Sequence, residues 1–457
     1  MYAVFCALAL TGGSVFAQTA VNPAGTAEDA SGVAIGTGSY SQNIGVAIGQ
    51  NASAVTSGSV AIGPNTKAGR ANMDDPQDPR NRTTVGKMAN VAIGSGAEAE
   101  GGRIISIGEN AGKGVPDNWN IHNVNIGTQA GGASKESNSV AIGYQAGFME
   151  SDEAKQAQAD RADGTRAANL YIGSQAGHNS YSYGNIALGT QAGDNVNDTR
   201  SNNNISIGSN AGQYMKSNDG VNEKFKGYGP GGNIAIGVAA AQYLAGDDNV
   251  AIGGLAGRNS KGDNNVFMGH LAGYQSTYYA SVVLGGQTGG GDPNAVHDKD
   301  VMIGNYANGA ATGNTRNVIS IGSSPIAEGY ESIAIGFNAK AKANNANAMG
   351  RMATATALDS IAVGTATETS GEKGIAIGYQ SNVSGAFGDP STVSGNGSYS
   401  FGNNNTISKD GTFVLGSNVT ASQANSVILG QNSTDRAATS VNQATVGSVT
   451  YGGFAGV

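Results

Sequence analysis

Cysteine, charge and aromatic side chains are all scarce in this chain, and each shortage excludes a class of protein. The one cysteine, Cys6, leaves no material for a disulfide framework or a cysteine-based metal site. Charged residues make up 13% of the 457 residues, the net charge is −8, and no run of Lys and Arg occurs. This balance argues against nucleic-acid and anionic-membrane binding. No segment after the N-terminal residues has the ~18 consecutive apolar residues of a membrane-spanning helix.

The N-terminal residues differ from the rest of the chain in being continuously apolar. The stretch Tyr2 to Leu10 is followed by a pair of glycines and by small residues that end at Ala17. This pattern predicts a signal peptide over residues 1–17, with the mature chain starting near Gln18. The positively charged start of such a signal is missing, so the predicted signal is incomplete, and a short buried strand is the alternative.

Glycine is abundant instead, with 73 residues, and it recurs at a regular interval. A tetrapeptide of apolar residue, Ala, apolar residue and Gly is repeated with small changes from Val33 to Gly430. The interval is 14 residues at Gly336, Gly350, Gly364 and Gly378, and 16 residues at Gly237, Gly253, Gly269 and Gly285. Self-similarity of this kind is the signature of a repeat architecture.

One repeat predicts a short strand, a turn at glycine and a second short extended piece. In Val-Ala-Ile-Gly, a strand places Val and Ile on one face and Ala and Gly on the other. Fourteen residues cannot hold two packed helices, and β-branched residues favour strands. We therefore predict an all-β parallel solenoid over residues 33–430, with coils of about 14–16 residues. We expect Val and Ile to fill its thin interior and the Ala/Gly face to associate with other chains.

Six segments interrupt the repeat and are expected to leave the coils as surface loops. They are residues 64–90, 110–124, 144–170, 212–233, 286–300 and 381–400. Such loops either contact a specific ligand or vary freely on a polar surface, and the sequence leaves both interpretations open. Trp119 and the tyrosines from Tyr274 to Tyr279 are the best candidates for individual contacts.

Residues that carry chemistry do not cluster in the sequence. The four histidines, His122, His178, His270 and His297, lack metal-ligand spacing, and each is expected to be a polar surface residue. Neither a phosphate-binding loop in the right context nor a nucleophile-elbow sequence occurs. We therefore predict no catalytic residues, no metal ion and no cofactor, and we expect the protein not to be an enzyme.

The repeat array and its last segment together resemble the YadA-like heads of trimeric autotransporter adhesins. The most specific match runs from Phe413 to Gly456 ("FVLGSNVTASQANSVILGQNSTDRAATSVNQATVGSVTYGGFAG"). The resemblance implies a left-handed parallel β-roll, assembly as a homotrimer, and export to the bacterial cell surface or outer membrane. It also implies that residues 431–457 close the head before a neck. Residues 18–32, between the predicted signal and the first repeat, are expected to form an N-terminal segment. We expect the neck and the membrane anchor to lie outside this chain.

The resemblance further implies adhesion to host extracellular matrix, such as collagen, fibronectin or laminin, or to host cells, together with autoagglutination or biofilm formation. In the family, NSVAIG-x-x-S units in the head are associated with collagen binding. Two stretches of this chain keep that frame. Residues 138–143 match its first six positions, and residues 425–433 match it with Ile-Leu in place of Ala-Ile. With the tryptophan added, the candidate ligand-binding residues are Asn138, Ser139, Val140, Ala141, Ile142, Gly143, Asn425, Ser426, Val427, Gly430, Ser433 and Trp119.

Two alternatives to adhesion stay open. First, the candidate residues are of the types that the core of a strand requires, so they could serve the fold alone and bind no ligand. The same repeat would serve a purely structural fibre or spacer module, as in phage or secretion systems, that presents a distal tip. A polysaccharide-acting solenoid enzyme would need Asp and Glu stacked on adjacent coils, and no such stack is in register.

Overall fold

The computed structural model consists of two compact units, residues 1–235 and 236–457. It describes residues 19–20, 26–27, 32–42, 44–69, 89–114, 122–134, 138–150, 168–180, 184–195, 202–216, 231–289, 292, 294–309, 311, 313–379, 392–437 and 443–453. Residues 1–17, Trp119 and the central parts of most of the six interruptions lie outside this set. The described residues form β-strands and turns without a helix, and none of them forms a segment suited to cross a membrane as a helix.

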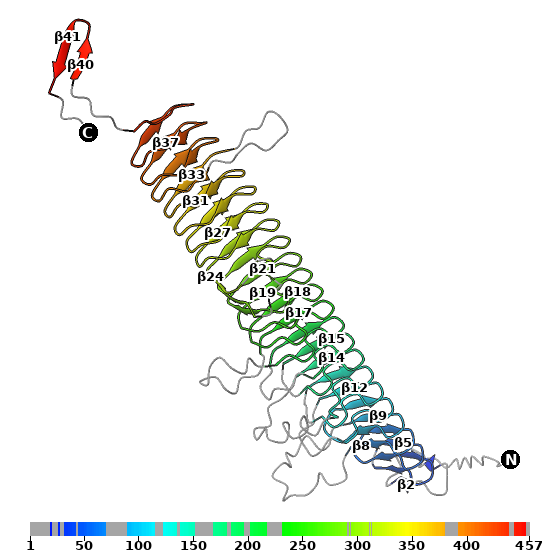
Figure 1. The fold of residues 1–457 in the computed structure, drawn as a ribbon. Helices are drawn as coiled ribbons and strands as arrows, with labels where there is room; N and C mark the ends of the chain where they lie inside the picture. Colours follow the sequence, from blue (N-terminus) through cyan, green and yellow to red (C-terminus); the bar gives the residue numbers. More distant parts are fainter. Residues whose placement is uncertain are drawn as a thin grey trace, which may run out of the picture. The chain divides into compact units, whose positions relative to one another are not determined.

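The first unit contains a long parallel sheet and a shorter one on the opposite side of the coils (Figure 1). The long sheet is built from β1 (Thr19–Ala20), β3 (Val33–Ile35), β5 (Val46–Ile48), β7 (Val60–Ile62), β9 (Val91–Ile93), β11 (Ile105–Ile107), β12 (Val124–Ile126), β13 (Val140–Ile142), β14 (Leu170–Ile172), β15 (Ile186–Leu188) and β16 (Ile205–Ile207). The short sheet is built from β2 (Thr26–Ala27), β4 (Tyr40–Ser41), β6 (Ser53–Ala54), β8 (Lys67–Ala68) and β10 (Glu98–Ala99). Strand β17 (Ile234–Ile236) spans the boundary between the units.

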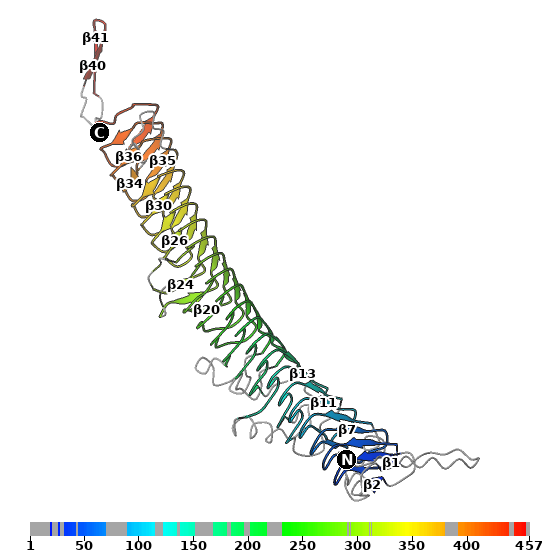
Figure 2. The same ribbon diagram turned by 90° about the vertical axis from the view of Figure 1, so that its right-hand side faces the viewer.

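The second unit repeats this plan with further coils. Its long sheet is built from β18 (Val250–Ile252), β19 (Val266–Met268), β21 (Val282–Leu284), β23 (Val301–Ile303), β25 (Ile319–Ile321), β27 (Ile333–Ile335), β29 (Asn347–Met349), β31 (Ile361–Val363), β33 (Ile375–Ile377), β35 (Tyr399–Phe401), β37 (Phe413–Leu415) and β39 (Val427–Leu429). Opposite these lie β20 (Thr277–Tyr279), β22 (Val296–Asp298) and β24 (Thr315–Arg316), then β26 (Ile326–Ala327), β28 (Lys340–Ala341), β30 (Thr354–Ala355), β32 (Glu368–Thr369), β34 (Thr392–Val393), β36 (Thr406–Ile407) and β38 (Thr420–Ala421). Figure 2 shows β26, β30, β34 and β36 stacked in this second row. An antiparallel hairpin, β40 (Gln443–Val446) and β41 (Val449–Gly452), follows.

Each tetrapeptide lies directly on the next, so the register repeats the sequence period. In the first unit Val46 pairs with Val60 and Ile48 with Ile62, and in the second unit Ile333 pairs with Asn347. All of these pairings are parallel, as expected when every coil returns to its starting side before the next strand begins. The predicted all-β solenoid of stacked coils is therefore confirmed.

The interior of the coils is made of small side chains. In the coil that starts at β27, the inward residues are Ser332, Ala334, Ala339 and Ala341, all 0% exposed. The same four positions of the next coil hold Ala346, Ala348, Ala353 and Ala355. In these coils the two sheets thus meet across alanine methyl groups. The last 14-residue coils instead bury larger side chains, Ile407, Val414, Val419 and Ile428.

The predicted orientation of the motif is wrong. The central Ala of Val-Ala-Ile points into the coil, while Val and Ile lie on the outer face of the long sheet and stay partly exposed. The alternation itself is as expected, but the two faces are exchanged. The interior has room for the one central side chain of the motif, which is Ala in most coils, so the Val and Ile on either side of it lie outside.

Longer coils admit some large residues, and glycines make room for them. Tyr171 and Phe267 occupy the central motif position, where most coils have Ala, and are almost fully buried. A Cβ added to Gly147 would lie 2.9 Å from the Tyr171 ring, and one added to Gly257 would lie 2.8 Å from the Phe267 ring. The Ala-Gly pair that follows the tetrapeptide in 16-residue coils therefore provides the space that these rings fill.

The glycine that ends the tetrapeptide is required for two reasons, its backbone conformation and its closeness to the next coil. Gly322 has φ +134°, and a Cβ on it would lie 2.7 Å from the main-chain oxygen of Gly336 in the next coil. An L side chain disfavours that φ, and a real Cβ does not approach a carbonyl oxygen so closely. Coils can therefore follow one another at this corner only because neither has a side chain there.

We predict that Gly322→Ala lowers the free energy of unfolding by roughly 2–5 kcal/mol, since it combines backbone strain with a collision against the next coil. Gly397→Ala is the matched control, because Gly397 also has a positive φ (+59°) but has open space around it. It should cost about 1–2 kcal/mol. Equal losses in chemical denaturation of the two variants would show that close coil contact is not the constraint.

Because Ala faces the interior and Ile the outside, stability should be more sensitive to enlarging the Ala side chain than to shortening the Ile side chain. Ala334→Val adds two methyl groups to a fully buried position and should cost about 1–3 kcal/mol. Ile335→Val, one residue further on the outer face, should cost about 1 kcal/mol or less. Thermal unfolding of the two variants decides between the arrangements, because an interior filled by Ile would reverse the order.

Candidate functional site

The outer face of the long sheet presents a ladder of Val and Ile side chains in each unit. We call this surface the outer ladder. In the first unit one of its columns consists of Val46, Val60, Val91, Ile105, Val124 and Val140. Toward the end of the second unit exposure is high, with Leu415 at 53%, Val427 at 71% and Leu429 at 62%. A continuous apolar surface of this kind marks an interaction site.

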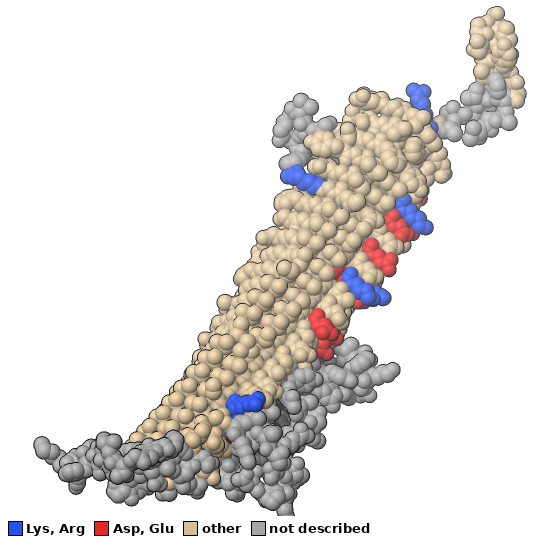
Figure 3. Space-filling model, turned by 180° about the vertical axis from the view of Figure 1, so that it is seen from behind, with Lys and Arg blue, Asp and Glu red and all other residues tan. Residues whose placement is uncertain are grey.

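On the face that Figure 3 shows, most of the charged side chains lie along one edge. Figure 3 shows a narrow stripe in which Lys, Arg, Asp and Glu of both signs alternate, beside a broad face without charge. Mixed signs give no strong field that would attract a polyanion or a polycation. The uncharged face in this view therefore offers apolar and hydrogen-bonding contacts.

The first set of candidate ligand-binding residues lies in the coil of β13. Ser139 is 5% exposed and its hydroxyl accepts the Asn169 N–H at 3.1 Å. Ala141 points into the interior, while Val140 and Ile142 belong to the outer ladder. These four residues serve the fold or the outer face.

The remaining two residues of this set shape the corners of the coil. Gly143 has φ +136° and lies against Gly173 of the next coil. Asn138 has φ +58°, and its side-chain oxygen lies 3.1 Å from Nδ1 of His122. A positive φ is tolerated by asparagine better than by most other residues.

The second set lies at the last strand, β39. Asn425 is exposed at a corner with φ +55°, and the main-chain oxygen of Ser426 accepts the Phe413 N–H at 2.8 Å. Val427 is 71% exposed on the outer ladder, and Gly430 ends the tetrapeptide. The Ser433 hydroxyl donates to the Leu429 carbonyl at 2.8 Å. The two sets lie in different units, and Trp119 lies outside the described residues.

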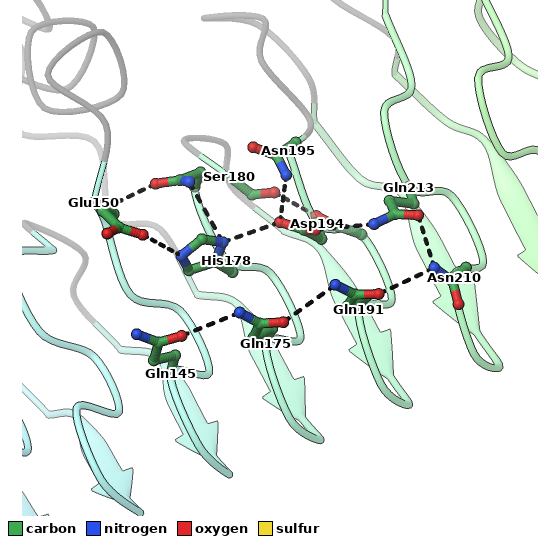
Figure 4. Close-up of polar contacts among 12 residues, drawn as sticks. Gln145, Glu150, Gln175, His178, Ser180, Gln191, Asp194, Asn195, Asn210 and Gln213 are labelled. Atoms are coloured by element: carbon green, nitrogen blue, oxygen red, sulfur yellow. Dashed lines mark hydrogen bonds and ion pairs between the residues drawn. The ribbon is translucent and has the colours of Figure 1, made fainter.

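A ladder of side-chain amides runs along one corner of the first unit (Figure 4). Gln145 donates to Gln129 at 2.9 Å, Gln175 to Gln145 at 3.1 Å, Gln191 to Gln175 at 3.1 Å, and Asn210 to Gln191 at 3.2 Å. All five residues have φ between +52° and +58°. Hydrogen bonds between coils thus stabilise a backbone conformation that glutamine disfavours. The repeated Gln before Ala-Gly in the sequence is the signal of this ladder.

Beside the amide ladder, His178 lies within a buried polar cluster (Figure 4). Its Nδ1 is 3.1 Å from Oδ1 of Asp194, which also accepts Asn195 Nδ2 at 2.8 Å. The other oxygen of Asp194 accepts Gln213 Nε2 at 3.0 Å. The exposed carboxylate of Glu150 lies 3.6 Å from Nε2 of His178. Because His178 and Asp194 are 7% and 3% exposed, the expectation of a surface histidine is wrong here.

A second buried polar cluster surrounds His297 in the second unit. His297 Nδ1 lies 2.6 Å from the hydroxyl of Thr315, which donates to Oδ2 of Asp300. The other oxygen of Asp300 accepts the Val318 N–H at 3.0 Å. His297 is 2% exposed, so it too is not the surface residue that was expected. The chain of hydrogen bonds satisfies each buried polar group in turn.

Tyr278 packs on this cluster and is not a surface contact, contrary to expectation. Its ring is 0% exposed and stacks on His297 with centroids 4.7 Å apart. Burial raises the pKa of the Tyr278 hydroxyl well above its usual range, so the phenol keeps its proton. The hydroxyl donates to the main-chain oxygen of Gly289.

The period and packing define the class of this chain, a parallel β-solenoid with an apolar outer ladder. The family model of the YadA head domain repeat (two copies) matches residues 45–66, 327–346, 348–367 and 370–388. The chain therefore carries a YadA-like head domain of the kind found in trimeric autotransporter adhesins, and the predicted resemblance is confirmed. No curated protein matched the chain. The family indicates an adhesin-type domain exported to the cell surface, and such heads are generally non-enzymatic.

We predict that Thr315→Val lowers the free energy of unfolding by about 1–3 kcal/mol, because it leaves buried groups of His297 and Asp300 without their hydrogen-bond partner. Thr406→Val is the matched control on the exposed face of the second unit and should change stability by no more than about 0.5 kcal/mol. Chemical denaturation measures both. Equal effects would mean that the buried cluster contributes nothing specific.

Proposed function

We propose that this chain is the head of a bacterial cell-surface adhesin that works as a homotrimer and attaches to host matrix or host cells by many repeated contacts. The exposure of the outer ladder supports this proposal most directly. Val and Ile side chains arranged in register over many coils are unfavourable in water, and sister chains offer a matching surface of the same period. Covering the ladder in this way leaves the second row of strands facing outward.

The outward surface is suited to extended contact. In the second unit its exposed residues include Lys340, Lys342, Thr406 and Thr420. The interior cavity beside Tyr171 has a volume of only about 10 Å³, far below the roughly 300–1,000 Å³ of a small-molecule pocket. Among the candidate residues away from the outer ladder, Asn425 and Gly430 are exposed and Asn138 is half-buried at a corner. Many weak contacts on three chains would then add up through avidity.

A purely structural spacer is the second candidate function. One observation favours it, because Ser139, Ala141 and Gly143 of the collagen-associated frame serve the fold of their coil. A spacer needs the same stacked coils but no ligand. The two functions differ in whether the assembled chain binds a matrix protein.

We predict that the assembled chain binds at least one of immobilised collagen, fibronectin and laminin. Ile335→Asp combined with Ile361→Asp places charges on the outer ladder and should weaken binding by about 100-fold or more, since avidity requires linked chains. Thr406→Asp adds a charge on the opposite face and should leave assembly intact. If the assembled chain binds none of the three proteins in a surface-plasmon measurement, attachment to host matrix is contradicted and the spacer function is favoured.

A further inference from the structure

His178 has one ring nitrogen whose interactions are unexplained. Its side chain is 9% exposed, and Nε2 is buried without a hydrogen-bond partner. Nδ1 faces the Asp194 carboxylate at 3.1 Å and the Asn179 amide nitrogen at 3.4 Å. The shorter contact is to an acceptor, which favours the proton of a neutral ring on Nδ1. Nε2 therefore presents a lone pair. A buried polar atom in this state calls for a missing partner such as an ion.

The nearest group to that lone pair is itself an electron donor. Oε2 of Glu150 lies 3.6 Å from Nε2, which is too long for a hydrogen bond. Two ligand atoms of a tetrahedral metal ion with bonds of about 2.0–2.2 Å lie about 3.4 Å apart. The separation of Nε2 and Oε2 therefore fits one shared ion. Figure 4 shows that both groups point toward the same space.

The surroundings hold both groups in place. Asp194 fixes the tautomer of His178 and is itself hydrogen-bonded by Asn195 and Gln213. A carboxylate on the second nitrogen is the usual support of a metal-binding histidine, because it orients the ring and raises its basicity. The side-chain oxygen of Asn179 accepts the Glu150 N–H at 2.7 Å. The ligand groups thus come from two adjacent coils with their main chains tied together.

We propose that His178 and Glu150 bind a divalent transition-metal ion, for which zinc is the best fit. Imidazole nitrogen and carboxylate oxygen are both zinc ligands. The described residues contain no group of three or more His, Cys, Asp and Glu that converges on one ion, so two ligands come from the chain and water completes the shell. Glu150 is 70% exposed on its side chain, which leaves the site open to solvent. The binding is accordingly weak and reversible.

The test uses the full chain without an affinity tag, freed of metal by a chelator and titrated with zinc chloride in a calorimeter. We expect one site per chain in the first unit and a rise in the unfolding temperature that EDTA reverses. His178→Gln should abolish this binding, and Asp194→Asn should weaken it about tenfold. His270→Gln, which changes an exposed histidine, is the matched control and should bind zinc like the unchanged chain.

If His178→Gln fails to fold, Glu150→Gln still tests the proposal. The Glu150 side chain is exposed and glutamine has the same shape, so this variant should fold. It should weaken zinc binding at least tenfold while leaving the unfolding temperature of the metal-free chain unchanged. Zinc uptake that is equal in the unchanged chain, His178→Gln and Glu150→Gln would overturn the proposal. So would the absence of uptake at about 1 mM zinc, at which concentration even millimolar sites are half filled.

Discussion

The close passage of backbone over backbone at each motif glycine is the constraint on which the rest of the structure depends. Gly322 lies so near Gly336 that no side chain fits between them, and its φ is one that other residues avoid. Coils that meet so tightly enclose a narrow interior, and in most coils Ala and Ser fill the inward positions of the long sheet. The large apolar residues are then forced outward. Thin coils and an apolar exterior are two results of one packing requirement.

Ladders of polar side chains stabilise the stacked coils, whose interior is thinner than the hydrophobic core of a globular domain. Main-chain N–H groups of one coil are accepted by side chains of the previous one, as Asn185 accepts the N–H of Asn204 at 2.8 Å. At the corner of the first unit, side-chain amides instead bond to one another from coil to coil. Because such bonds repeat along each unit, they keep the coils in register. A surface held in register in this way can present one contact many times, which is what avidity requires.

The sequence predicted the period, the strands, the parallel stacking and the family resemblance, because all of these follow from the spacing of Gly and the alternation around it. The prediction of which face lies inside was wrong. The alternation in Val-Ala-Ile defines two faces of a strand but does not say which one is buried. The width of the coil decides which face lies inside. His178 and His297 were misplaced for a related reason. Each is buried only because a neighbouring coil supplies Asp194 or Thr315, and such partners cannot be read from one repeat.

The central claim is that the outer ladder of Val and Ile is covered by sister chains. The mass of the intact chain in solution, measured by light scattering after size-exclusion chromatography, tests this claim most directly. The account predicts a species of three times the 45.5 kDa of one chain. A species of 45.5 kDa with a β-sheet circular dichroism spectrum and cooperative unfolding would contradict it.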